Sequence, residues 1–227
     1  MGNSIIAKRK RCATIIPMKR LILVDDHKML RKGIISYITE NSDWQIFAEA
    51  ERAEEIPGII KEAGKAGGSI TVAVVDMQLK GEKDGFNEGY NVVKMLSQGN
   101  IPSVIFSSHD SGACINKAIS AEVGAKGFVS KSSDERILLD AINAVADGKT
   151  YIQSELVAGV LENRSLRSML TKRESQVLDY MMDGFSNEEI AAKLKIKLTT
   201  IENYISIIYD KTGSRNKVAL LEKLKYN

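Results

Sequence analysis

The sequence contains little cysteine, histidine or proline, and it lacks long apolar runs. Its 227 residues include 2 cysteines, 2 histidines and 3 prolines. Cys12 and Cys114 have the spacing of neither a metal site nor a redox motif, which suits a reducing cytoplasm. No apolar stretch approaches the roughly 20 residues that a helix needs to cross a bilayer. We therefore expect a cytoplasmic protein that has no membrane partner.

Charge is distributed unevenly along the chain. Residues 1–17 hold four basic residues and no acidic one, residues 18–150 hold 16 basic against 19 acidic residues, and residues 169–227 hold 10 against 8. The basic excess at the C-terminal end indicates an anionic partner, although a solvated surface explains it as well. We interpret residues 1–17 as a disordered basic leader and expect Met18 to be the native start. An intact mass that included the leader would refute this expectation.

Short β-branched runs alternate with segments of helical period from about residue 20 to residue 148. The runs are typical of buried strands, and the segments between them are typical of helices. Strands are expected at 21–24, 45–48, 70–75, 104–106 and 127–129, and helices at 28–39, 53–66, 88–98, 111–122 and 134–147. The pattern predicts an α/β domain with a five-stranded parallel, doubly wound sheet.

The remainder of the chain has helical period throughout. Helices are expected at 172–183, 187–194, 199–211 and 215–225. We therefore predict a leader at 1–17, an α/β domain at 18–148, a linker at 149–168 and an all-α four-helix domain at 169–227.

Acidic residues follow two of the predicted strands. Asp25 and Asp26 come directly after the first strand, and Asp76 comes directly after the third. The carboxyl ends of parallel strands lie at one edge of a sheet, where ligands of such sheets bind. Three carboxylates at one edge are suited to Mg²⁺ (magnesium). A DD pair alone is more often a turn or a helix cap.

A hydroxyl and an amine follow two further strands. Ser107 ends the fourth strand, and Lys131 follows the fifth. Acids with a metal, a hydroxyl and a fixed cation together complement a phosphoryl group. Lys131 alone would be an ordinary surface lysine, and we expect His27 and His109 to be solvated.

Several stretches carry a resemblance to a known family. They are "LILVDDHKMLRKGI", "VAVVDMQL", "IPSVIFSSHD", "AISAEVGAKGFVSK" and "LLDAINAVADGKTYI". Residues 20–148 resemble a response-regulator receiver domain, and the chain from about 18 to 225 is similar to the NarL/FixJ/LuxR class of two-component transcription regulators. The resemblance implies that a histidine kinase transfers a phosphoryl group to this chain, which is not otherwise an enzyme.

The resemblance also implies roles for individual residues. Asp76 would be the phosphoacceptor, and Lys131 would pair with the phosphoryl group. Asp26 would bind Mg²⁺ directly and Asp25 through water. In the same way, Ser107 would be the switch hydroxyl and Phe128 the switch aromatic.

One stretch departs from the family pattern. Leu79 and Lys80 stand where the family usually has Met-Pro, and the following loop is about five residues longer than usual. The loss of proline puts the phosphorylation rate and the phosphoryl lifetime in doubt. A phosphatase of related fold is disfavoured, because Gln78 stands where a second catalytic acid would follow Asp76.

The C-terminal helices have the spacing of a helix-turn-helix unit. Ser186 with Glu189 forms a capping box, and Ile201, Ile208 and either Tyr204 or Ile205 have core spacing in the next helix. Such a helix can lie in the major groove of DNA. On spacing alone, a plain four-helix bundle is about as consistent with the pattern.

Residues 169–222 resemble the LuxR-type DNA-binding domain through "LTKRE", "GFSNEEIAAKL" and "TIENY". Glu202 departs from it, because members commonly have lysine there, and Lys197 replaces a serine cap. An alternative is therefore a phosphorylation-dependent regulator whose output domain binds protein instead of DNA. The candidate DNA-binding residues are Lys195, Lys197, Thr199, Thr200, Glu202, Asn203, Ser206, Lys211 and Arg215.

The last helix carries an apolar stripe of Val218, Leu221 and Leu224. In the family this helix helps two domains to pair, which implies a homodimer on phosphorylation or on DNA. Core packing within one chain explains the same stripe.

Overall fold

The computed structural model describes residues 18–65, 69–79, 85–182 and 184–225. The predictions about the leader at 1–17 and about the loop at 80–84 lie outside these residues. Within the described residues no helix is long and apolar enough to span a membrane.

The first part of the chain alternates strands and helices as the sequence predicts. The strands are β1 (Lys19–Val24), β2 (Gln45–Ala50), β3 (Ile70–Val75), β4 (Ser103–Ser107), β5 (Gly127–Ser130) and β6 (Tyr151–Ile152). The helices are α1 (Lys28–Asn41), η1 (Ala53–Glu55), α2 (Ile56–Lys65), α3 (Gly85–Gln98), α4 (Gly112–Ala118) and α5 (Glu135–Ala146). Helix α4 ends four residues earlier than predicted, at a turn where the Ser120 hydroxyl donates to the Lys117 carbonyl.

All strands are parallel, in the order β2-β1-β3-β4-β5-β6. The predicted number of five is wrong by one, because β6 adds a sixth strand beside β5. Two residues are too few to show the alternation that reveals a strand in a sequence. The order reverses between β1 and β3, so the carboxyl ends of these two strands are neighbours.

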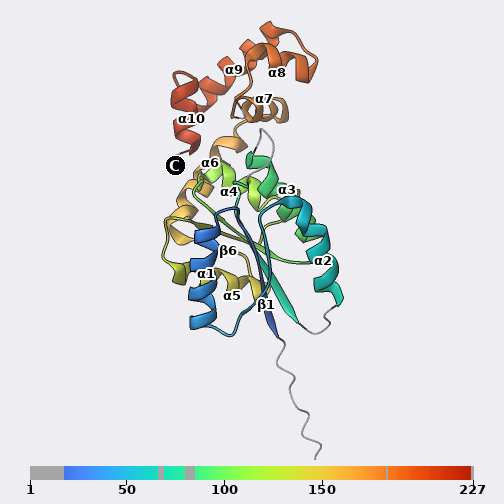
Figure 1. Ribbon diagram of the computed structural model, residues 1–227. Coiled ribbons are helices and arrows are strands. Elements are labelled where there is room, and N and C mark those ends of the chain that lie inside the picture. The colour runs from blue at the N-terminus through green and yellow to red at the C-terminus, as the bar shows by residue number, and fades with distance from the viewer. Residues whose placement is uncertain (1–17, 66–68, 80–84, 183, 226–227) are drawn as a thin grey trace, which may run out of the picture.

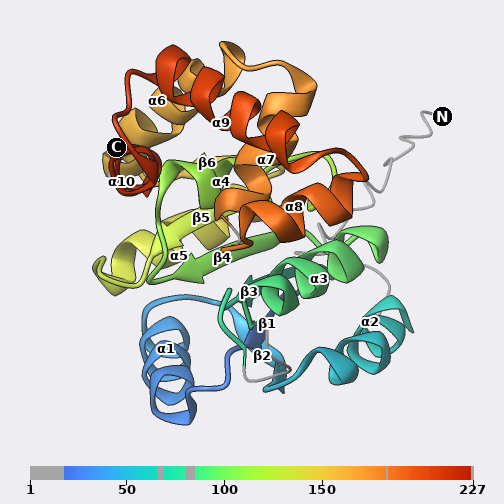
Figure 2. The same cartoon turned by 90° about the horizontal axis from the view of Figure 1, so that it is seen from above.

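Helices cover both faces of the sheet (Figures 1 and 2), and each face carries its own hydrophobic core. On one face, Ile22, Val75, Ile105 and Phe128 belong to a core that α2, α3 and α4 cover. On the other, Leu21, Val74 and Phe106 belong to a core that α1 and α5 cover. Alternate residues of β1 and β3 thus serve opposite cores, which explains why these strands read as unbroken apolar runs.

The C-terminal part is helical. Its helices are α7 (Lys172–Met182), α8 (Asn187–Leu194), α9 (Leu198–Thr212) and α10 (Lys217–Lys225). Ser186 and Glu189 form the predicted capping box. Ile201, Ile205 and Ile208 of α9 are buried at the predicted core spacing. This confirms the α/β domain followed by an all-α four-helix domain.

Helix α6 (Val157–Ser168) joins the two parts and follows η2 (Ser154–Leu156). Val160 belongs to the core between the sheet and α4, whereas Leu166 belongs to the core of the C-terminal helices. Helix α6 packs closely on α4, and α10 also contacts α4. Figure 1 shows α4 and α6 together at the end of the sheet that faces α7 to α10.

Candidate functional site

The predicted acids and the lysine meet at the carboxyl edge of the sheet. The Lys131 Nζ atom lies 2.8 Å from Asp25 Oδ2 and 2.7 Å from Asp76 Oδ2. Asp25 and Asp76 are 5% and 3% exposed, and 5% of the Asp26 side chain is exposed. Buried carboxylates repel one another unless a cation lies between them. Lys131 is one such cation.

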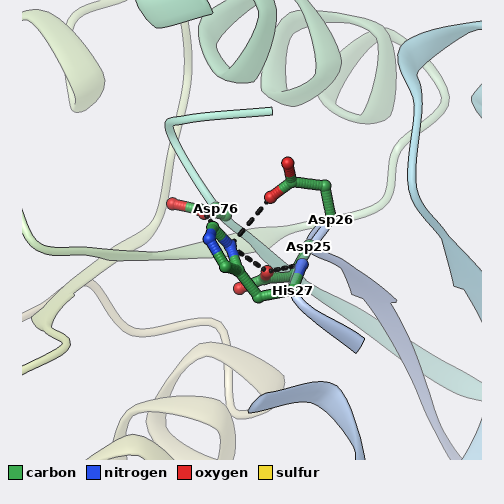
Figure 3. Close-up of side chains that lie close together, drawn as sticks. All are labelled: Asp25, Asp26, His27 and Asp76. Atoms are coloured by element: carbon green, nitrogen blue, oxygen red, sulfur yellow. Dashed lines mark hydrogen bonds and ion pairs between the residues drawn. The ribbon is translucent and has the colours of Figure 1, made fainter. Parts of the chain in front are cut away.

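His27 is a second basic group in the cluster (Figure 3). Its Nδ1 atom lies 2.8 Å from Asp26 Oδ1, 3.2 Å from Asp25 Oδ1 and 3.9 Å from Asp76 Oδ2. Its backbone N–H donates to Asp25 Oδ1 at 2.7 Å. As predicted, the His27 side chain is largely solvated, with 58% of it exposed, although its Nδ1 atom contacts the acids. His109 is also exposed, as predicted.

Arg31 fixes the backbone next to the acid cluster, and its role was not predicted from the sequence. Its Nη1 donates to the backbone carbonyl of Asp25, while Nε and Nη2 donate to Glu49 at 3.0 Å and Glu51 at 2.6 Å. Only 4% of Arg31 is exposed. It lies one turn after His27 on the buried face of α1, which is the signal that could have identified it.

The backbone fixes where each carboxylate points. The Asp76 N–H donates to the Val24 carbonyl at 2.8 Å, which continues the pairing of β1 and β3 past the strand ends. The Gln78 N–H donates to Asp76 Oδ1 at 3.1 Å, which leaves Oδ2 facing Lys131. The Lys131 N–H donates to the Ser107 carbonyl at 2.9 Å. The carboxyl ends of β1, β3, β4 and β5 therefore hold the cluster in place.

Burial raises the pKa of Asp76 above its ordinary value, with a smaller contribution from the nearby Asp25 charge. The hydrogen bonds from Lys131 and from the Gln78 backbone oppose this rise without cancelling it. Asp76 is thus a buried carboxylate whose charged form is held by a few specific contacts.

Ser107 and Phe128 lie on one face of the sheet. Ile105 is paired with Phe128 in the register of β4 and β5, and Ser107 follows Ile105 by two residues. Residues two apart in a strand share a face, so Ser107 and Phe128 both face the core that includes Ile115 of α4. Both are fully buried. Phe128 therefore already points inward, and the Ser107 hydroxyl accepts from the His109 N–H at 3.0 Å.

The candidate DNA-binding residues form an open surface on α9 and the turns beside it. Glu202, Asn203 and Ser206 are exposed on the face opposite the buried isoleucines. The other exposed candidates are Lys195, Lys197, Thr199, Lys211 and Arg215, while Thr200 is half-buried. Lys195 has a left-handed backbone with φ 55, which makes the turn between α8 and α9.

Two of these candidates have a structural relationship of their own. Lys211 Nζ donates to Glu174 Oε2 at 2.7 Å, and this contact lowers the pKa of Glu174. Lys211 therefore ties α9 to α7, where Glu174 is buried. Lys197 is the N-cap residue of α9, where its side chain accepts no capping hydrogen bond.

The residues of the predicted apolar stripe on α10 differ in their burial. Leu224 is fully buried in the core of the C-terminal helices, so core packing explains it. Val218 is 64% exposed and remains available to another surface. The side chain of Leu221 lies outside the described part of the chain.

Two family models match this chain. Residues 21–143 match the response regulator receiver domain, and residues 168–224 match the luxR family of bacterial regulatory proteins. The first match contains the acid cluster, Ser107, Phe128 and Lys131. The second contains α7 to α10.

Curated relatives align with nearly the whole chain. The transcriptional regulatory protein UhpA of Salmonella typhimurium is 28% identical over 207 residues, which cover 91% of this chain and 98% of UhpA. The transcriptional regulatory protein DesR of Bacillus subtilis is 26% identical over 208 residues, covering 92% and 97% of the two chains.

Solved structures share the fold. A LuxR-family two-component response regulator from Aurantimonas sp. is 30% identical with a TM-score of 0.55, covering 64% of this chain and 97% of that chain. The response regulator RcsB, in a complex with DNA, has a TM-score of 0.60 at 24% identity, covering 92% and 98%.

Proposed function

Because the chain belongs to the response regulators that join a receiver domain to a LuxR-type regulatory domain, we propose that Asp76 accepts a phosphoryl group from a histidine kinase and thereby controls DNA binding. This family consists of transcriptional regulators rather than classical enzymes. The single observation that carries the proposal is the contact of Lys131 with both Asp25 and Asp76 at the edge of the sheet.

The residues present fit a Mg²⁺ ion. Three carboxylates supply the oxygen ligands that Mg²⁺ prefers, and their ligand atoms lie within 4.8 Å of one another. Asp26 would bind the ion directly, with Asp25 acting through water and Asp76 as a further ligand. When bound, the ion would neutralise charge that develops on the phosphoryl oxygens.

The chain itself supplies position and charge for the transfer. A carboxylate oxygen of Asp76 forms a bond to phosphorus while the bond from phosphorus to the kinase imidazole nitrogen breaks, and the leaving imidazole takes up a proton. Lys131 is placed to pair with a phosphoryl oxygen, since its Nζ already contacts Asp76 Oδ2. Ser107 would then turn its hydroxyl from the His109 N–H toward the phosphoryl group. The domain thus promotes its own phosphorylation by positioning the reacting groups and by electrostatic stabilisation.

Helix α4 connects this site to the rest of the chain in our proposal. Ser107 and Phe128 face the core beneath α4, and α4 packs on α6. The Asn116 side chain of α4 donates to the Val160 carbonyl and to Asn163 Oδ1, each at 3.1 Å. A turn of Ser107 would shift α4 and therefore α6. A coupling of about 1–3 kcal/mol between two arrangements is enough for a useful switch.

The exposure of α9 favours a switch in which phosphorylation pairs two chains. It disfavours a switch in which phosphorylation uncovers the DNA-binding surface. Glu202, Asn203 and Ser206 lie exposed on α9, so this surface is already open in the structure. A shift of α4 and α6 would therefore change how two output domains are placed relative to each other. We propose a homodimer on phosphorylation, in which Val218 contributes to the contact.

We propose that the domain boundaries are those the sequence predicts, with a receiver at 18–148, a linker at 149–168 and an output domain at 169–227. The linker range contains β6, η2 and α6. The protein would act in the cytoplasm, where kinase and DNA are both accessible.

An electrophoretic shift experiment tests the functional proposal. The chain, with and without prior phosphorylation, is mixed with the DNA upstream of its own gene at two salt concentrations. We expect phosphorylation to tighten binding and salt to weaken it, because basic side chains displace counterions from phosphates. The Asp76→Asn variant should show no response to the phosphoryl donor. No shift under any condition would favour the alternative, an output domain that binds protein.

A further inference from the structure

The position of His27 bears on which ion the acid cluster prefers. The ligand atoms around a small divalent ion with bonds of about 2.1 Å lie about 3.0 Å apart when adjacent and about 4.2 Å apart when opposite. His27 Nδ1 lies 2.8 Å, 3.2 Å and 3.9 Å from oxygens of Asp26, Asp25 and Asp76. The separations from Asp26 and Asp76, the two carboxylates that would bind directly, lie close to those expected between ligands of one ion.

The backbone holds His27 in this place. The residue is the N-cap of α1, with φ −88 and ψ 91, and its N–H is bound to Asp25 Oδ1. Arg31, one turn later, fixes the carbonyl of Asp25 and thus the start of the same turn. Figure 3 shows the imidazole lying among the three carboxylates. The ring can therefore reach a cation held by the carboxylates without a rearrangement of the chain.

We propose that His27 is a nitrogen ligand of the cation and gives the site a preference for Mn²⁺ over Mg²⁺. Mg²⁺ takes oxygen ligands and keeps its waters, so an imidazole adds little to its binding. Ions of the first transition series accept imidazole, and Mn²⁺ also suits carboxylates. Two carboxylates that bind directly, a third that acts through water and one imidazole therefore fit Mn²⁺ better than Mg²⁺. The inference rests on the cation site of the proposed function and specifies its ligands.

A simpler role for His27 is a hydrogen-bonded cap that merely fixes Asp25 and Asp26. The two roles differ in one measurable respect. A cap would raise the affinity for every divalent ion equally, because it acts only by positioning the carboxylates. A ligand would support Mn²⁺ more than Mg²⁺, and it would place a nitrogen nucleus in direct contact with the metal.

The test measures Mn²⁺ binding to the full chain, using the electron paramagnetic resonance signal of free Mn²⁺ to follow the titration. Mg²⁺ affinity is measured by competition in the same samples. For His27→Ala we expect Mn²⁺ affinity to fall about tenfold and Mg²⁺ affinity to change by less than about threefold. The matched control is His109→Ala, which removes the other histidine, an exposed one.

A spectroscopic measurement decides the role directly. Electron spin-echo modulation of bound Mn²⁺ should show coupling to a ¹⁴N nucleus in the wild-type chain and in His109→Ala, and no such coupling in His27→Ala. Absence of the coupling in the wild type, or an equal loss of Mn²⁺ and Mg²⁺ affinity in His27→Ala, would overturn the proposal. Labelling of wild-type Asp76 is scored separately. Labelling without nitrogen coupling would reject only the ligand role, whereas coupling without labelling would reject only the proposed function.

Discussion

The Nζ atom of Lys131 lies 2.7 Å from Oδ2 of Asp76, although 55 residues separate the two in the chain. The same amine lies 2.8 Å from Asp25, 106 residues away. The contacts join the ends of β1, β3 and β5, and they place a fixed positive charge beside the carboxylate that we propose as the phosphoacceptor.

Replacing Lys131 by methionine should slow phosphorylation of Asp76. The side chain keeps its volume while the charge is lost, so we expect labelling by acetyl phosphate to slow about 100-fold. Rapid-quench labelling measures the rate. Lys126→Met, which removes an exposed lysine just before β5, is the matched control and should label at the wild-type rate. Equal rates in both variants would show that Lys131 does not act on the phosphoryl group.

The Asp76→Asn chain should be more stable than the wild type at neutral pH. Burial raises the pKa of Asp76, so the charged carboxylate costs stability at every pH above that pKa. As the pH falls through the pKa, the wild-type residue takes up a proton and the advantage of the variant should shrink. Urea unfolding at several pH values measures this. A stability difference that stays constant with pH would contradict the account, and the exposed Asp140→Asn should show little difference throughout.

Replacing Gly112 by alanine should loosen α6 from α4. A Cβ atom at Gly112 would collide with the carbonyl oxygen of Gly159, so the two helices cannot keep their present separation. We expect faster hydrogen exchange of the α6 amides in this variant. Gly33→Ala on α1 is the control, because nothing lies within 4 Å of its added Cβ. It should leave α6 unchanged and stabilise α1 by about 0.5–1 kcal/mol. Unchanged exchange in Gly112→Ala would remove the proposed link between α4 and α6.

A serine at position 197 should stabilise the output domain. Lys197 begins α9 without a side-chain acceptor for the free N–H groups of the first turn. A serine hydroxyl supplies one, so we expect Lys197→Ser to raise the free energy of unfolding by about 1 kcal/mol. Thermal unfolding of the full chain measures the change. Lys195→Ser, in the turn before α9, should not stabilise the chain, and equal effects would refute the capping explanation.

The fold and most of the acid cluster could be predicted from the sequence because parallel strands bring their carboxyl ends to one edge. Asp25, Asp76 and Lys131 are each placed there by the strand that precedes them. Alternation of apolar strands with helical segments is a local pattern, so it gave the strands and helices to within a few residues.

Other features depend on contacts that no local pattern contains. The two residues of β6 are a strand only because β5 lies beside them. His27 follows the acids in sequence, but the turn of the backbone at the start of α1 decides that its ring points back to them. The docking of α6 on α4 requires Gly112 and Gly159 to meet, which neither glycine indicates alone.

The most direct test of the central claim is the intact mass of the chain after incubation with acetyl phosphate and Mg²⁺. Peptide mapping of the product then locates the modified residue. The account predicts the addition of one phosphoryl group, located on Asp76, and none in Asp76→Asn. A phosphoryl group that persists in Asp76→Asn, or that maps to Asp25 or Asp26, would contradict it.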